Sequence, residues 1–170
     1  MARRCPALSE AIIVTAPDIV LSVGLAGGRT ELSLERIAIN IDDARIPDND
    51  GNLPIDRPVV VGGPAAYFAT LPIKAAVAAL REAGLPAAVS NSAGTFLCNH
   101  VFYGLMHEAA AGAGRFRAGF LHVPYLPSQS AHVPGAPSMA IEQIVAGIEV
   151  VLSVAAARRD DLVVSEGALS

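Results

Sequence analysis

Residues 18–24, DIVLSVG, form a continuous apolar run that follows Pro17 and ends in a glycine. A short apolar run with such boundaries is typical of a β-strand buried on both faces, as in a parallel sheet. Residues 35–41, ERIAINI, alternate polar and apolar side chains and predict a second strand. Residues 71–84 predict a helix, with a proline in its first turn and a glycine just past its end. Strands that alternate with helices indicate an α/β fold with a mainly parallel sheet.

The remaining segments continue this pattern to the end of the chain. They are the end of a helix at 7–16, a surface loop at 42–58, a short strand within 86–94, a helix at 97–110, a strand at 118–127 that runs into a proline-rich loop, and a long helix at 138–159 with Ser138 as its N-cap. We expect a single domain, residues 1–170, with frayed ends at about 1–6 and 160–170.

The composition argues against several classes of protein. The 170 residues carry a formal net charge of -4 without a basic cluster, so neither a nucleic acid nor a membrane surface is an expected partner. The two cysteines, Cys5 and Cys98, cannot build a disulfide framework and lack the spacing of a zinc site, which favours a reducing, cytoplasmic location. The hydrophobic stretch 11–28 is broken by Pro17 and Asp18, so neither a membrane span nor a signal-peptide core is predicted.

Cys98 is the first candidate for a reactive side chain. It lies where the turn SAGTF (92–96) runs into the predicted helix at 97–110. A thiol at a helix N-terminus is close to the positive end of the helix dipole and to free backbone N–H groups, which favour the thiolate and could bind an oxyanion. The alternative is a small buried hydrophobic residue, a common environment for a free cysteine.

A cysteine nucleophile needs a base, and His122 is the best placed of the four histidines. It ends the apolar run AGFL, and ligands of α/β sheets bind beyond the carboxyl ends of strands. His100 and His107 are expected to be partly exposed helix residues, and His132 lies in a loop rich in proline and glycine. The alternative for His122 is a core histidine with satisfied hydrogen bonds.

Glu35 is the candidate for the group that orients the imidazole, because it begins an otherwise apolar strand where a carboxylate needs a partner. The alternative is a structural ion pair with Arg36 or Arg45, while Glu31 is expected to be an ordinary loop charge. The segment GLAGGRT (24–30) matches neither nucleotide-binding glycine pattern, and no H-E-x-x-H order is present.

Several segments together resemble one family, pyroglutamyl peptidase I. They are GLAGGRTELSLERIAINIDDARIPDN, GGPAAYFATLPIK, SNSAGTFLCNHVFYGLMH, GFLHVPYLPSQ and PSMAIEQIVAGIE, so the likeness runs from about residue 17 to 150. The resemblance implies a cytosolic cysteine exopeptidase that removes N-terminal pyroglutamyl residues from peptides and proteins. It implies a three-layer α/β/α sandwich with a mainly parallel, mixed sheet, a homotetramer, and no metal or organic cofactor. The family's motifs place its nucleophile on Cys98, its histidine on His122 and its glutamate on Glu35.

The resemblance also bears on the substrate site. Phe96 and Leu97 precede the nucleophile and are candidate walls of an apolar pocket for the neutral lactam ring. Arg45 is a candidate for binding the substrate or the oxyanion, with a structural ion pair as its alternative. The family's N-terminal strand, glycine-rich loop, helix and second strand have no counterpart here, so we expect an N-terminally truncated member. Two other functions stay open: an impaired relative that acts as an assembly or binding protein, and a different hydrolase, such as an amidase.

Overall fold

The computed structural model describes residues 6–167, and the expected fraying of residues 1–5 and 168–170 lies outside this range. The strands are β1 (Ile19–Leu25), β2 (Leu32–Glu35), β3 (Ile37–Ile39), β4 (Ala66–Phe68), β5 (Ala87–Ser90) and β6 (Arg117–Val123). The helices are α1 (Pro6–Thr15), α2 (Ile73–Glu82), α3 (Leu97–Ala111), α4 (Pro127–Ser130) and α5 (Ile141–Ala157). Within the described range, no helix is both long and apolar enough to span a bilayer.

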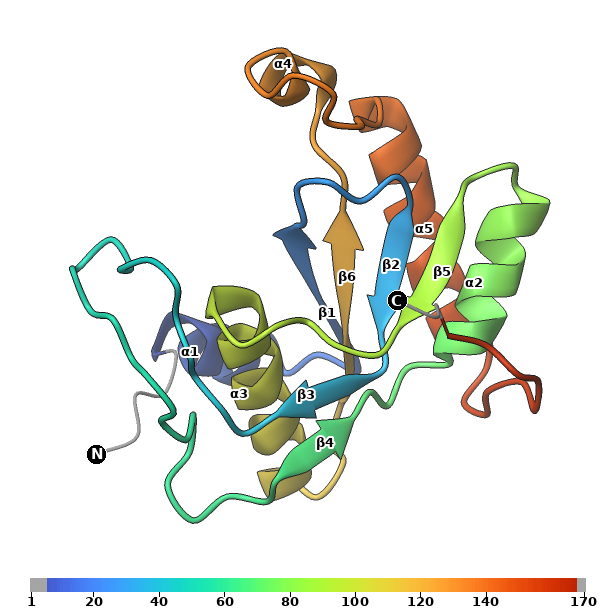
Figure 1. The fold of residues 1–170 in the computed structure, drawn as a ribbon. Helices are drawn as coiled ribbons and strands as arrows, with labels where there is room; N and C mark the ends of the chain where they lie inside the picture. Colours follow the sequence, from blue (N-terminus) through green and yellow to red (C-terminus); the bar gives the residue numbers. More distant parts are fainter. Residues whose placement is uncertain (1–5, 168–170) are drawn as a thin grey trace.

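The central sheet has four strands in the order β1-β6-β2-β5, with α2 and α5 on one face and α1 and α3 on the other (Figure 1). β1 pairs with β6 and β2 pairs with β5 in parallel, whereas β2 and β6 are antiparallel. The predicted α/β/α sandwich with a mixed, mainly parallel sheet is confirmed. A small antiparallel sheet of β3 and β4 lies beside it.

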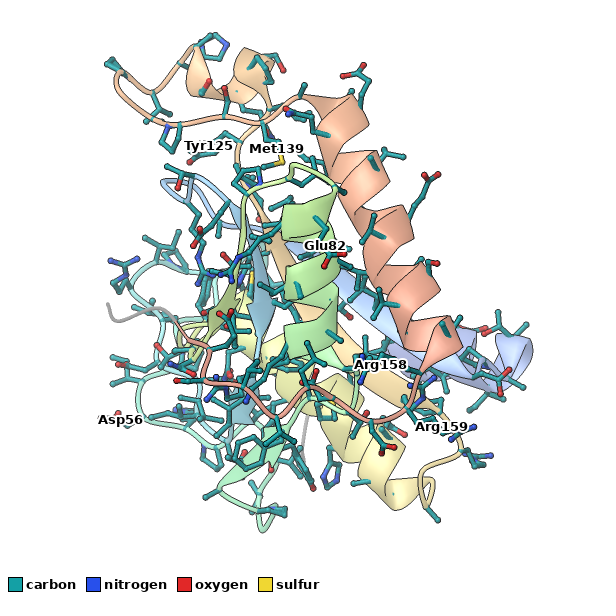
Figure 2. All side chains as sticks on the ribbon, turned by 90° about the vertical axis from the view of Figure 1, so that its right-hand side faces the viewer. Asp56, Glu82, Tyr125, Met139, Arg158 and Arg159 are labelled. Carbon is teal, nitrogen blue, oxygen red and sulfur yellow. The ribbon has the colours of Figure 1, made fainter. Side chains whose placement is uncertain are left out.

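Two cores fill the spaces between the layers, as the alternation of side chains along each strand requires. In β6, Leu121 packs in the core on the α2 and α5 side, and Phe120 packs on the α3 side. Tyr125 follows β6, and its carbonyl oxygen accepts a 2.8 Å hydrogen bond from the amide of Met139 (Figure 2). This contact ties the chain after β6 to the segment that leads into α5.

Two strand predictions need correction. The run 35–41 is not one strand: Glu35 ends β2, and β3 starts at Ile37 in the second sheet. The break occurs at Arg36, whose amide donates to Ser90, the last residue of β5, and whose carbonyl accepts from Ala69 near the small sheet. Residues 18–24 are not buried on both faces either. β1 lies at the sheet edge with β6 as its neighbour, and Val23 is 45% exposed.

The predictions for the C-terminal helix also differ from the structure. Ser138 is not the N-cap of α5, because Ala140 holds that position and its amide donates to the side chain of Gln143. We expected the chain to be frayed from residue 160 onward, but Asp161 and Glu166 both make specific contacts. Asp161 accepts hydrogen bonds from two amides at the start of α2, and Glu166 forms an ion pair with Arg81.

Candidate active site

The pairing of β2 with β6 brings Glu35 and His122 to the same face of the sheet. Ser33 lies opposite His122 in this antiparallel pair. Because side chains alternate between faces, Glu35 shares the face of Ser33 and therefore that of His122. α3 covers this face, since Phe120 in β6 packs against Phe102 in α3 with ring centroids 5.6 Å apart.

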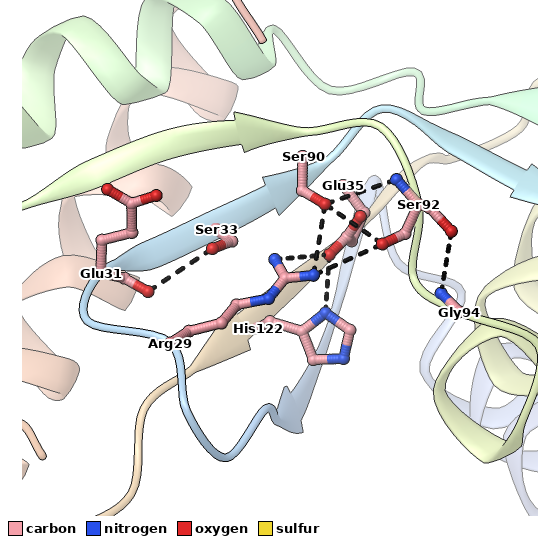
Figure 3. Close-up of polar contacts among 8 residues, drawn as sticks. All are labelled: Arg29, Glu31, Ser33, Glu35, Ser90, Ser92, Gly94 and His122. Atoms are coloured by element: carbon pink, nitrogen blue, oxygen red, sulfur yellow. Dashed lines mark hydrogen bonds and ion pairs between the residues drawn. The ribbon is translucent and has the colours of Figure 1, made fainter. Parts of the chain in front are cut away.

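Glu35 and His122 form a direct, buried contact. His122 Nδ1 lies 2.7 Å from Glu35 Oε1, and the two side chains are 4% and 0% exposed (Figure 3). A carboxylate at Nδ1 favours the tautomer with its proton on that nitrogen, which leaves Nε2 free to accept a proton. The pair therefore has the arrangement of a general base and its orienting carboxylate.

Arg29 is the cation that pairs with Glu35. Its Nη1 lies 3.0 Å from Glu35 Oε1, the same oxygen that His122 contacts (Figure 3). The structural alternative that named Arg36 or Arg45 as the partner is wrong. The Arg36 guanidinium instead donates to the backbone carbonyl of Glu166, and Arg45 is exposed in the loop after β3.

Cys98 lies in the first turn of α3, as the sequence predicts. The turn before it includes Gly94 at φ +80°, a left-handed conformation that favours glycine, and the backbone is extended at Phe96, the N-cap. The side chain of Phe96 makes no capping hydrogen bond, so the first N–H groups of the helix remain able to bind a ligand. Cys98 is a free thiol and half-buried, which keeps the sulfur within reach of a substrate.

His122 also interacts with Cys98, and this contact affects its titration. Burial lowers the pKa of His122, but hydrogen bonds with Cys98 and Glu35 and the negative charges of both partners raise it by more. The pKa of His122 consequently lies above its ordinary value of 6.5. Since Glu35 occupies Nδ1, Nε2 is the ring nitrogen available to the thiol. The structure therefore brings Cys98, His122 and Glu35 together from three elements.

Asn99 is a site residue that the sequence analysis did not single out. It is completely buried and follows Cys98 in α3. Its side chain accepts a hydrogen bond from the amide of Ile39 at 3.0 Å and donates to the carbonyls of Ile39 at 2.9 Å and Ile41 at 3.0 Å. These three bonds fix the first turn of α3 against β3, and so fix the place of Cys98. The sequence signal that could have identified Asn99 is its position, because its amide side chain directly follows the candidate nucleophile.

Phe96 and Leu97 line a cavity of about 570 Å³ between the start of α3 and the loop after β3. Its other lining residues are Asp42, Asp48, Asn52, Leu53, Pro54, Arg57, Pro58, Val59, Val61 and His100. Neither Cys98 nor Arg45 is among them. The two predicted wall residues thus border a cavity that none of Cys98, His122 and Glu35 lines, and Arg45 remains an exposed loop residue.

Two of the other histidines, His100 and His107, have side-chain partners of their own. His100 Nδ1 lies 2.8 Å from Asp42 Oδ2, and His107 Nδ1 lies 2.8 Å from the hydroxyl of Tyr67. His132 is exposed after α4. Among residues 6–167, no three His, Cys, Asp or Glu side chains are grouped so that they could hold a metal ion.

Comparisons with known proteins give the family. The family described as pyroglutamyl peptidase matches residues 3–158. Pyrrolidone-carboxylate peptidase 1 of Ralstonia nicotianae is 56% identical over 155 residues, which cover 91% of this chain and 72% of the relative. A pyrrolidone-carboxylate peptidase of Escherichia fergusonii is 55% identical over 161 residues, which cover 95% of this chain and 75% of the relative.

The solved structures that resemble this chain are of the same kind of peptidase as its sequence relatives. The crystal structure of pyroglutamyl peptidase I from Bacillus amyloliquefaciens superposes with a TM-score of 0.91 at 46% identity, covering 94% of this chain and 76% of that one. A mutant pyrrolidone carboxyl peptidase from Pyrococcus furiosus gives a TM-score of 0.87 at 44% identity, covering 89% of this chain and 75% of that one. With the family matched over almost the whole chain and relatives more than half identical, this chain belongs to the pyroglutamyl peptidase family.

Proposed function

We propose that this protein is a cysteine exopeptidase that removes N-terminal pyroglutamyl residues, with Cys98, His122 and Glu35 as its catalytic residues. The single observation that carries the assignment of residues is the buried 2.7 Å contact between His122 Nδ1 and Glu35 Oε1, with Cys98 close enough to the same imidazole to raise its pKa. The names of the relatives support the substrate class. A binding protein without catalysis has no use for this arrangement, so the geometry favours the enzyme.

In the first half of the proposed reaction, Cys98 Sγ attacks the carbonyl carbon that links the pyroglutamyl residue to the peptide. His122 Nε2 takes the thiol proton, and the resulting imidazolium later gives it to the departing amine. Glu35 holds the ring and stabilises its positive charge. In the second half, His122 activates a water molecule that attacks the thioester and releases pyroglutamate.

The oxyanion formed by the attack needs hydrogen-bond donors. The uncapped N–H groups at the start of α3 are the first choice, because they adjoin Cys98 and lie at the positive end of the helix. Arg45, an exposed side chain in the loop after β3, is a further candidate. Phe96 and Leu97 would contact the neutral substrate through apolar walls.

We also propose that the protein acts on peptides and proteins with an N-terminal pyroglutamate in the cytoplasm, as a homotetramer. The free Cys98 supports a reducing compartment. Ile13 and Val14 are each 76% exposed, and such apolar side chains on α1 would be covered in an oligomer. Light scattering coupled to size-exclusion chromatography should give the mass of four chains, and the mass of one chain would contradict the proposal.

The activity itself is tested with a fluorogenic pyroglutamyl amide. We expect wild-type protein to release the fluorophore, and Cys98→Ser to abolish release while circular dichroism and melting temperature stay unchanged. Cys5→Ser is the matched control and should retain full activity. Absence of turnover by folded wild-type protein, or retained turnover in Cys98→Ser, would overturn the assignment.

A further inference from the structure

We propose that Arg29 is a positioning residue of this site, which holds Glu35 in one orientation and ties it to the turn that carries Cys98. The inference rests on the proposed function and extends it to a residue outside the catalytic trio. Arg29 lies in the loop between β1 and β2, six residues before Glu35.

The contacts of Arg29 join two parts of the site. While Nη1 is 3.0 Å from Glu35 Oε1, Nη2 donates to the hydroxyl of Ser90 at 3.3 Å and to the carbonyl of Ser92 at 3.4 Å (Figure 3). Ser90 ends β5, and Ser92 belongs to the turn that leads into α3 and Cys98. One guanidinium therefore links the carboxylate to the segment that positions the nucleophile.

The buried carboxylate of Glu35 has few partners. The carboxylate is 0% exposed, and a buried charge without a partner is strongly unfavourable. Both of its cationic partners, Arg29 and His122, contact Oε1, whereas Oε2 has no hydrogen-bond partner within residues 6–167. Without Arg29, the imidazole of His122 would be the one remaining partner that the structure gives to this carboxylate.

The shape of the guanidinium matters as well as its charge. Arginine presents several donors in a planar fork, so it can hold Oε1 with one nitrogen and the Ser90–Ser92 segment with the other. A lysine at position 29 would keep the charge but has a single donor group on a flexible stem. The two functions of Arg29 can therefore be separated by substitution.

The sign of the electrostatic effect follows from the groups that face His122. They are Glu35 from β2, Cys98 from α3 and, through Glu35, Arg29 from the β1–β2 loop. A cation in this group disfavours protonation of its neighbours, so its removal should raise the pKa of His122. Arg29 is 30% exposed, which reduces the effect through solvent screening. We expect a shift of about one pH unit.

The experiment compares Arg29→Gln and Arg29→Lys with wild type. In Arg29→Gln, the acid limb of the kcat/KM profile should move to higher pH by about one unit, and the maximum should fall about tenfold. Arg29→Lys should leave the limb in place but lower kcat several-fold with little change in KM. Arg115→Gln removes one exposed positive charge beyond the far end of α3 and should match wild type.

A second measurement needs no substrate. The rate of alkylation of Cys98 by iodoacetamide, followed by peptide mass spectrometry, should show its pH midpoint displaced upward in Arg29→Gln and unchanged in Arg29→Lys. If Arg29→Gln does not fold, Arg29→Lys still tests the proposal through the fall in kcat. Unchanged kcat in Arg29→Lys, or a folded Arg29→Gln whose pH profiles match wild type, would overturn it.

The outcomes separate this inference from the proposed function. If wild type does not cleave pyroglutamyl amides, the proposed function fails, and the alkylation profiles still decide the role of Arg29. If wild type is active and Cys98→Ser is inactive, while both Arg29 variants behave like wild type, the inference about Arg29 alone fails.

Discussion

Replacement of Glu35 by glutamine should slow the reaction while the site keeps its geometry. Both contacts of the carboxylate go to Oε1, with His122 at 2.7 Å and Arg29 at 3.0 Å, and Oε2 has no partner among the described residues. In Glu35→Gln, the amide oxygen can take the place of Oε1, and the NH₂ group can take the place of Oε2. The substitution then removes a charge and little else.

The size of the effect follows from the loss of that charge. A hydrogen bond to a charged group contributes about 1.5–3 kcal/mol, and a neutral one about 0.5–1.5 kcal/mol. The imidazolium of His122 should lose roughly 1–2 kcal/mol of stabilisation in the transition state, which corresponds to about a 5- to 30-fold fall in kcat/KM. The pKa of His122 should fall as well, because the charge of Glu35 and its hydrogen bond both raise it in wild type.

The assay is kcat/KM for a fluorogenic pyroglutamyl amide across the neutral pH range. The acid limb of Glu35→Gln should move to lower pH, which is opposite to the shift expected for Arg29→Gln. Glu31→Gln is the matched control, because the hydrogen bond that the structure gives Glu31 is accepted by its backbone carbonyl, from the hydroxyl of Ser33, and not by its side chain. If folded Glu35→Gln had the rate and the acid limb of wild type, the role given to Glu35 would be wrong.

Two further predictions concern the surroundings of the site. In Gly24→Ala, the new Cβ would lie 2.7 Å from Phe120 Cζ and 3.1 Å from Cys98 Sγ. Thermal melts should therefore show that the free energy of unfolding falls by about 1–3 kcal/mol, and kinetics should show that kcat/KM falls about tenfold. In Gly104→Ala, the new Cβ would have no neighbour within 4 Å among the described residues, so this variant should instead gain about 0.5–1 kcal/mol. Equal effects of the two substitutions would contradict the packing argument. Because the pKa of His122 is raised above 6.5, its contribution to the free energy of unfolding should be full below that pH and lost as pH rises through the raised value. Urea titrations of His122→Gln at several pH values should lack this pH dependence of the free energy of unfolding. If the variant kept the pH dependence of wild type, His122 would not be its source.

The order of strands and helices was predictable because each segment carries its own periodicity. The antiparallel pairing of β2 with β6 was not, since a short buried strand has the same pattern in either direction. That pairing places Ser33 opposite His122, and so decides that Glu35 can reach the imidazole. The break at Arg36 was missed for a similar reason, because regular alternation continued although the hydrogen-bonding partner changed.

The candidate site was predictable where a residue type and its position were informative together. A thiol before a helix and a histidine at the end of a strand are local signals, and the structure places Cys98 close enough to His122 to raise the pKa of the imidazole. Arg29 was missed because nothing local marks an arginine that reaches residues 61 and 63 positions away. The sequence did indicate that the buried carboxylate of Glu35 needs a partner. The cations considered for it, however, were the nearest arginines that follow Glu35 in the chain.

The proposed mechanism requires that Cys98 forms a covalent bond with the pyroglutamyl group during turnover. A single-turnover reaction with a pyroglutamyl ester, quenched in acid and digested, tests it by mass spectrometry. We expect a pyroglutamyl thioester on the peptide that contains Cys98, formed fast enough to account for turnover and absent from Cys98→Ser. Turnover by Cys98→Ser, or an adduct on another residue that forms at the rate of turnover, would contradict this mechanism.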